Sequence, residues 1–262
     1  MTLRHLLTHT AGLPPFEKYY LDLKAKPGTT QAKREILERA QAAPLDSEPG
    51  AKSEYSDIGF ILLGEILERL TGKPLDQLAR ERIFAPLAMN DTLFNPPKSL
   101  RARIAPAEND AAFRKRLVHG EVHDENAWAM GGVSGHAGMF STATNLAAFC
   151  QMLLNGGIYA HQRLLRRATV NQFAAAQALS GNTRALGWTV PTEDSSSGRF
   201  FSAHSFGHTG FTGTSIWIDP DKELFVILLT NRVYPTRENE KIQQVRPAVH
   251  DAVAEALGLA PK

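Results

Sequence analysis

Histidine and threonine side chains stand inside a glycine-rich segment, residues 207–213, that leads into a strongly apolar stretch. Three glycines in seven residues weaken a strand unless another group must approach its backbone closely. A strand edge with little side-chain bulk that carries His208 and Thr209 is typical of the wall of a substrate cleft. A glycine-rich bend at the corner of a sheet explains the same glycines equally well.

Histidines elsewhere in the chain raise the question of a metal site. His119 and His123 are four residues apart with Asp124 beside them, and His204 and His208 repeat the spacing. Two imidazoles at this spacing converge on one ion only in a helix, and a glycine within each pair argues against helix. No HExxH pattern is present. The sequence therefore predicts no metal and no cofactor, although a metal hydrolase using His119, His123 and Asp124 stays as one hypothesis.

Candidate nucleophiles are few. The G-x-S-x-G elbow of α/β-hydrolases is absent, and Ser134, in Gly-Val-Ser-Gly, lacks its spacing and is interpreted as a turn residue. Cys150 lies on an apolar helical face, which predicts an inert core thiol. No serine in the chain is followed by lysine three residues later.

The elements that would position His208 form a predicted β-hairpin. Residues 214–218 are β-branched and aromatic, residues 219–222 are typical of a turn, and residues 224–229 are almost continuously apolar. Such an apolar run favours a strand covered on both faces. A second long element begins at Ser56 or Asp57, either of which can cap a helix that ends at Gly72 and whose first half should be buried.

Periodicity and turn signals predict the remaining elements. The expected helices span residues 2–10, 30–42, 75–83, 141–155, 168–176 and 245–257, and a strand is expected at 186–190. In the last helix, Val245, Val249, Val253 and Leu257 are spaced to lie on the sheet.

Composition is that of an ordinary globular chain. Its 262 residues, 43% hydrophobic and 21% charged, predict a single domain spanning residues 1–262. A net charge of +2 without a basic stripe predicts no nucleic-acid partner. No apolar run is long enough to cross a bilayer, and no signal peptide follows Met1, so the localisation is unknown.

Two tripeptides, Tyr55-Ser56-Asp57 and His208-Thr209-Gly210, become specific when taken together and in this order. With them the chain resembles the serine β-lactamase and penicillin-binding-protein superfamily, in its class C-like branch. Further similarity lies in residues 3–14 (LRHLLTHTAGLP), 86–89 (PLAM), 137–142 (AGMFST) and 207–220. The resemblance implies an α+β fold, with an antiparallel β-sheet flanked by helices and a mainly helical lobe.

The same resemblance implies acyl transfer through a serine ester, with Tyr55 and His208 as catalytic residues. Tyr55 would transfer a proton, and it needs nearby cations to lower the pKa of its phenol. His208 stands at the lysine position of the family's K/H-T-G strand, where an imidazole can donate a hydrogen bond and is charged only toward acid pH.

The substrate-binding residues that the resemblance implies are Asp57, Thr209, Gly210 and Phe211. Thr209 would bind a carboxylate or ester oxygen, Gly210 would let the substrate lie against the strand, and the Phe211 N–H would be an oxyanion donor. Asp57 stands where asparagine is commoner, and an ionised carboxylate cannot donate a hydrogen bond to the substrate amide.

The family's S-x-x-K nucleophile motif precedes the segment in which this chain begins. We therefore expect an N-terminally truncated domain that lacks the first strands and the nucleophile helix. As written, the chain should be inactive as a hydrolase of the β-lactamase, D-alanyl-D-alanine carboxypeptidase or esterase type. Its partner would be a small-molecule or peptidoglycan-like acyl substrate, and a non-catalytic ligand-binding or sensor protein is the alternative.

Overall fold

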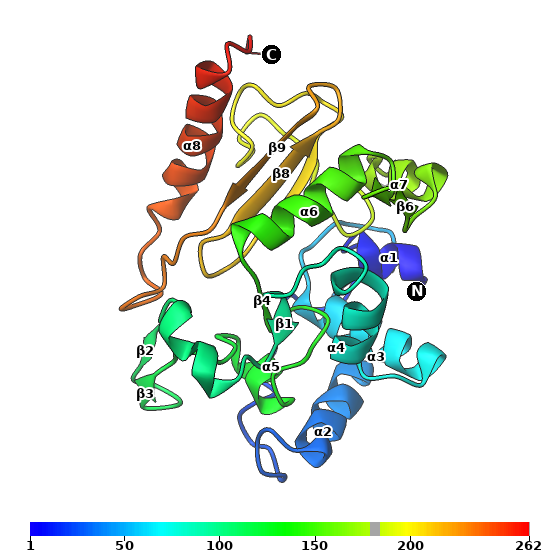
Figure 1. Ribbon diagram of the computed structural model, residues 1–262. Coiled ribbons are helices and arrows are strands. Elements are labelled where there is room, and N and C mark those ends of the chain that lie inside the picture. The colour runs from blue at the N-terminus through cyan, green and yellow to red at the C-terminus, as the bar shows by residue number, and fades with distance from the viewer. Residues whose placement is uncertain (179–183, 262) are drawn as a thin grey trace.

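The computed structural model describes residues 1–178 and 184–261 (Figure 1). The helices are α1 Leu3–Leu7, α2 Thr30–Gln41, α3 Asp57–Thr71, α4 Leu75–Ala79, α5 Glu125–Ala129, α6 Ala143–Leu154, α7 Arg167–Ala174 and α8 Ile242–Ala256, with a π-helix at Arg80–Phe84 and a 3-10 helix at Lys98–Arg103. The strands are β1 Leu93–Phe94, β2 Asn109–Asp110, β3 Arg116–Leu117, β4 Met139–Phe140, β5 Ile158–Tyr159, β6 Gln162–Arg163, β7 Phe206–Thr209, β8 Ser215–Asp219 and β9 Leu224–Leu228.

The main sheet is antiparallel, in the order β7-β8-β9. The predicted hairpin forms β8 and β9, with Trp217 opposite Val226, and β7 adds the glycine-rich segment with His208 opposite Ile216. Three two-stranded pairs, β1-β4, β2-β3 and β5-β6, lie outside this sheet. The fold is α+β, as predicted.

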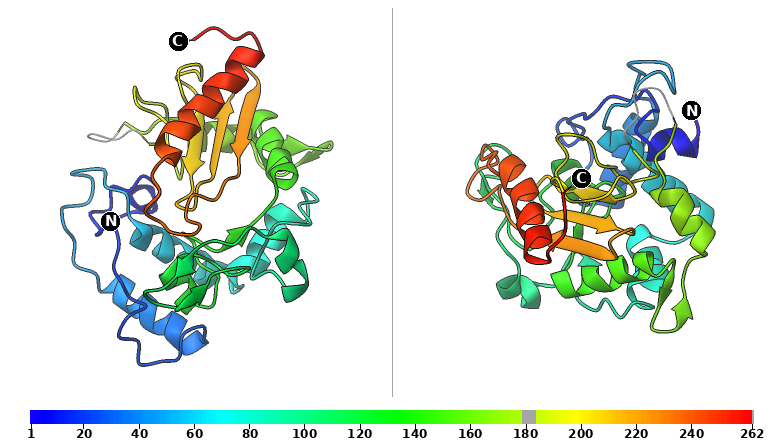
Figure 2. Two further views of the ribbon diagram at one scale, coloured as in Figure 1. Left: turned by 90° about the vertical axis from the view of Figure 1, so that its left-hand side faces the viewer. Right: turned by 90° about the horizontal axis from the view of Figure 1, so that it is seen from above.

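Helices cover both faces of the sheet. Helix α8 lies on one face and α6 on the other, as the side and end views show (Figure 2). Phe206 and Ile218 pack with Leu146 and Cys150 on the α6 side. On the opposite side Trp217 packs with Phe201. Both faces of the sheet are therefore covered by apolar side chains, which explains why β9 is apolar along its whole length.

A mainly helical lobe lies beside the sheet (Figure 1). Its core joins α1, α2, α3 and α5, with Ile36, Ile58 and Ile61 almost fully buried. Helix α3 begins as predicted: the Ser56 hydroxyl accepts a hydrogen bond from the Gly59 N–H, and Gly72 ends the helix in the left-handed conformation.

Two expectations about secondary structure need correction. The predicted helix at residues 75–83 divides into α4 and a π-helical turn. At residues 186–190 no full strand forms; Thr189 alone makes bridges, to Arg184 and to Gly207. Thr189 therefore extends the β7 edge of the sheet by a single residue.

The face of α8 also differs from the prediction. The buried row consists of Ile242, Arg246, His250 and Ala254, whereas Val245 is 40% exposed. Arg246 enters this interface because one end of its guanidinium finds acceptors there. The Arg246 guanidinium donates to the carbonyls of Gly210 and Thr214 in the sheet.

No helix within the described ranges is both long enough and apolar enough to cross a membrane.

Candidate active site

Tyr55 lies two residues before the start of α3, where hydrogen bonds of Ser56 with His9 and Pro14 fix the backbone. The Ser56 N–H donates to His9 Nδ1 at 2.9 Å, and the Ser56 hydroxyl donates to the Pro14 carbonyl at 2.6 Å. The His9 ring stacks on Tyr55, with centroids 4.4 Å apart. Tyr55 is 44% exposed, so its phenol is held by the N-terminal segment yet can be reached by a ligand.

His208 lies across from Tyr55. It occupies β7 opposite Ile216, and the centroids of the Tyr55 and His208 rings are 6.2 Å apart. The structure thus brings together two side chains that are 153 positions apart in the sequence.

The protonation state of His208 follows from its surroundings. Burial lowers its pKa, and the charges of Arg184 and Arg246 act in the same direction against the hydrogen bond with Thr209. His208 Nδ1 lies 2.9 Å from the Thr209 carbonyl, so the neutral ring carries its hydrogen on Nδ1 and Nε2 is the acceptor. A neutral His208 would therefore accept a hydrogen bond through Nε2, rather than donate one as the sequence suggested.

Tyr55 is a weak acid in this environment. Partial removal of the phenol from water, followed by the charge of Asp57, raises the pKa of Tyr55 to about 12, although the positive charge of Arg184 opposes the rise. His9 supplies no positive charge near neutral pH, because burial and the charges of Arg184 and His208 lower its pKa to about 3. Tyr55 is therefore a neutral phenol near pH 7 in this structure.

Beyond His208 the chain turns at Thr209, Gly210 and Phe211, which line a depression of about 180 Å³. The other lining residues are Arg232, Glu240, Ile242, Gln243 and Arg246. Among the described residues, no acceptor pairs with the Phe211 N–H. This free N–H suits a donor to a substrate oxygen.

Packing against neighbouring protein atoms explains why residue 210 is a glycine. A Cβ there would overlap the Thr214 hydroxyl oxygen. At Gly207 a Cβ would overlap the Trp217 indole and the Ile216 carbonyl. Neighbouring protein atoms thus account for both glycines without a substrate.

Two arginines and one glutamate, Glu240, bring charge to the depression. Arg246 is 9% exposed, and its Nε has no partner among the described atoms. The Arg232 guanidinium lies 4.2 Å from the centroid of Phe211, whose side chain is 59% exposed. A depression with two guanidinium groups and the Thr209 hydroxyl can hold a carboxylate.

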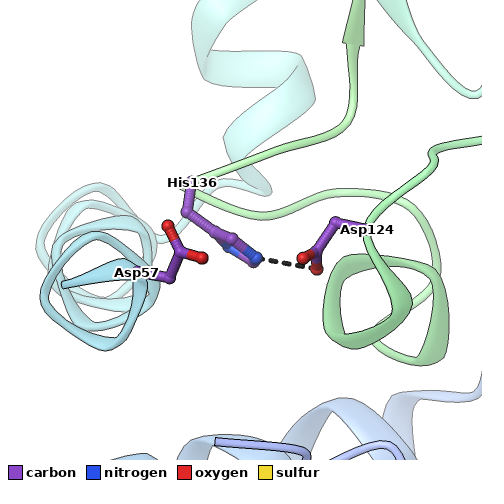
Figure 3. A group of neighbouring side chains, drawn as sticks. All are labelled: Asp57, Asp124 and His136. Carbon is purple, nitrogen blue, oxygen red and sulfur yellow. Dashed lines mark hydrogen bonds and ion pairs between the residues drawn. The ribbon is translucent and has the colours of Figure 1, made fainter. Parts of the chain in front are cut away.

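Asp57, the first residue of α3, faces a buried imidazole (Figure 3). His136 Nε2 lies 2.8 Å from Asp124 Oδ1, and His136 Nδ1 lies 2.8 Å from the Ser134 hydroxyl. Burial alone would lower the pKa of His136, but the hydrogen bond and charge of Asp124, with the charge of Asp57, raise it overall. Burial raises the pKa of Asp57, and the charge of His136 opposes that rise.

Asp57, Asp124 and His136 are also the described residues that could hold a metal ion, since one ligand atom from each lies within 4.8 Å of the others. Both ring nitrogens of His136 are already hydrogen-bonded, however. The arrangement in the structure is therefore a buried ion pair with a second carboxylate beside it.

The metal hypothesis built on His119, His123 and Asp124 is wrong, because these side chains face three different partners. His119 Nε2 lies 2.7 Å from the Ile104 carbonyl, and His123 Nε2 lies 2.8 Å from Glu108 Oε2. Asp124 pairs with His136 instead.

The sequence motifs did not point to the Ser134–His136–Asp124 chain or to Arg184. The available signal was the density of polar residues at 118–126 and of glycines at 131–138. The assignment of Ser134 as a simple turn residue omitted its buried hydrogen bond with His136. Cys150, by contrast, is an inert core thiol as predicted: it is fully buried, which raises its pKa to about 12.

Similarity to known proteins extends over almost the whole chain. A family model described as Beta-lactamase matches residues 1–250. A protein of Escherichia coli K12 named "Putative D-alanyl-D-alanine carboxypeptidase" is 36% identical over 258 residues, which cover 92% of this chain and 59% of that protein. This chain therefore spans about three fifths of the length of the curated relatives that it matches.

Solved structures show the same fold. A simvastatin synthase variant from Aspergillus terreus superposes with a TM-score of 0.69 at 22% identity, covering 98% of this chain and 66% of that one. A penicillin-binding protein homologue from Caulobacter crescentus gives a TM-score of 0.66 at 20% identity, covering 95% and 71%. The family match over residues 1–250 identifies this chain as a member of the beta-lactamase family.

Proposed function

We propose that this chain carries the tyrosine and histidine side of an acyl-transfer site that recognises D-alanyl peptides or related acyl compounds. The observation that carries the proposal is the meeting of Tyr55 and His208, with ring centroids 6.2 Å apart, at the positions that match the family's motifs. The name of the Escherichia coli relative supports a peptidoglycan-like substrate.

The depression beside β7 supports a substrate with a free carboxylate. Thr209 lines it together with Arg232 and Arg246. The terminal carboxylate of a D-alanyl peptide would pair with these donors, and Phe211 N–H would face the acyl oxygen. A neutral ester without a carboxylate would lose this interaction and bind more weakly.

Catalysis by this chain alone is not expected. None of its serines has a lysine three residues later, and the pKa of Tyr55 near 12 keeps the phenol protonated at neutral pH. Those two observations favour the second candidate, a protein that binds the acyl compound without cleaving it.

The test combines binding with covalent labelling. We expect a fluorescent penicillin and a D-alanyl-D-alanine peptide to bind saturably in fluorescence anisotropy and calorimetry. Tyr55→Phe and His208→Ala should weaken binding, while the matched variants Tyr234→Phe and His204→Ala should not, because the described ring contacts of Tyr55 and His208 include neither of these side chains. Absence of saturable binding would contradict the proposed site. A penicillin label that survives denaturation would contradict the expectation of inactivity.

A further inference from the structure

Arg184 places a positive charge against the face of Tyr55. Its guanidinium carbon lies 5.4 Å from the centroid of the Tyr55 ring. Electrostatic attraction between a guanidinium and an aromatic face is strongest when both are partly removed from water. The charge of Arg184 also acts on His9 and His208, the other two rings around Tyr55.

The fold ties Arg184 to the sheet that carries His208. Arg184 Nη1 donates to the Thr189 hydroxyl at 3.2 Å, and the backbones of the two residues form a β-bridge. Thr189 in turn bridges to Gly207, the residue before His208. A guanidinium anchored in this way keeps its position relative to both rings.

The two histidines whose rings lie against Tyr55 do not provide a cation near neutral pH, and His136 is paired with Asp124. His9 and His208 both have lowered pKa values, and Asp57 and Asp124 are acidic. Within the described chain, the positive charge that opposes the rise of the Tyr55 pKa is that of Arg184.

We propose that Arg184 is a positioning residue for Tyr55, holding a fixed positive charge over the ring that stabilises the phenolate through which Tyr55 would move a proton. This inference rests on the proposed role of Tyr55 in acyl transfer. It assigns to Arg184 a task that the sequence motifs do not contain. Arg184 acts through Tyr55, because its guanidinium lies over the Tyr55 ring while its hydrogen bond to Thr189 holds it at the sheet edge.

The experiment measures the ionisation of Tyr55 directly and needs no substrate. The five tyrosines are replaced biosynthetically by difluorotyrosine, whose fluorines acidify the phenol and bring its titration into a range where the fold survives. The ¹⁹F resonance of Tyr55 is assigned by its loss in Tyr55→Phe, and its midpoint is followed by NMR. Circular dichroism at each pH verifies that the chain is folded.

Removing an opposite charge at this separation should weaken ionisation about tenfold, a rise of roughly one pH unit in the midpoint. Arg184→Met should show this rise, and Arg184→Gln is a second neutral variant if the methionine variant does not fold. Arg184→Lys should retain most of the wild-type midpoint. Arg199→Met is the matched control, because Arg199 also lies over an aromatic ring, that of Phe200, but its side chain is 70% exposed.

A rise in the neutral variants alone supports the inference. An unchanged midpoint in the neutral variants, or an equal rise in Arg184→Lys or Arg199→Met, overturns it. The titration is independent of ligand binding, so failure here would leave the binding test of the proposed function standing, and the reverse also holds.

Discussion

Replacement of His136 by leucine tests a buried charged pair beside the candidate site. The His136 side chain is 2% exposed and that of Asp124 is 19% exposed, and their atoms Nε2 and Oδ1 are 2.8 Å apart. His136→Leu leaves the Asp124 carboxylate in place without its main partner. Removal of one member of a buried ion pair costs about 3–5 kcal/mol in free energy of unfolding.

The lower end of that range applies here. Asp124 Oδ1 also caps α5 by accepting a hydrogen bond from the Ala127 N–H at 2.7 Å, and this bond survives the substitution. We therefore expect a loss of about 3 kcal/mol, which for a chain of this size corresponds to roughly 6–12 °C in Tm.

The loss should depend on pH in a defined direction. The raised pKa of His136 means that its contribution is full below the unfolded value of about 6.5 and disappears as pH rises through the folded value. The lowered pKa of Asp124 means that its contribution is present above the unfolded value of about 3.9 and disappears as pH falls through the folded value. The difference between wild type and variant should therefore be greatest from about pH 4 to pH 6.5.

Urea unfolding followed by circular dichroism across this pH range measures the effect. The matched control is His204→Leu, which removes an ion pair of the same length to Asp221 on the surface, with side chains 76% and 50% exposed. That variant should lose much less stability than His136→Leu, because water screens an exposed pair. The reasoning is refuted if His136→Leu costs no more than His204→Leu, or if its cost is the same at pH 5 and pH 8.5.

Two further predictions concern packing. Cys150 should not react with a thiol reagent at pH 8 in the folded chain and should react fully in guanidinium chloride; labelling of the native protein would show that the α6 core opens. Gly135→Ala should destabilise the chain by roughly 1–3 kcal/mol, because a Cβ would overlap the Phe60 carbonyl oxygen in the backbone of α3. Gly59→Ala in the same helix is the control: its Cβ would meet atoms no closer than 3.6 Å, so thermal unfolding should shift little or upward.

Local chemistry in the sequence predicted the elements that have clear ends. The hydroxyl of Ser56 and the left-handed conformation at Gly72 each act within a few residues, so the limits of α3 could be derived without knowledge of the fold. The hairpin of β8 and β9 was predictable for the same reason, since its turn and its apolar strands are adjacent in the chain.

Elements whose position depends on distant partners were harder to derive. The apolar row beginning at Val245 indicated one face of α8, but the buried row contains Arg246 and His250. Arg246 is buried because two sheet carbonyls accept its hydrogen bonds, and hydrophobicity alone carries no information about those carbonyls.

The candidate site shows the same division. Tyr55 and His208 could be selected because each stands in a recognisable tripeptide, whereas Arg184 and His136 stand in no such motif. Their importance arises from juxtaposition: Arg184 reaches Tyr55 across 129 positions, and His136 faces Asp57 across 79.

The close contact between α3 and the loop at residues 134–138 has a practical consequence for protein engineering. Gly64 and Gly135 face each other with no side chain between them, since a Cβ on Gly64 would come within 2.9 Å of the Gly135 nitrogen. Because backbone touches backbone here, no side chain can change its rotamer to make room for an added methyl group. The separation of Asp57 from His136 is therefore set by the two backbones. Random libraries aimed at new ligand preference should leave Gly64 and Gly135 untouched and diversify Phe211 and Gln243 at the open rim, where replacement alters the ligand's surroundings without displacing these backbones.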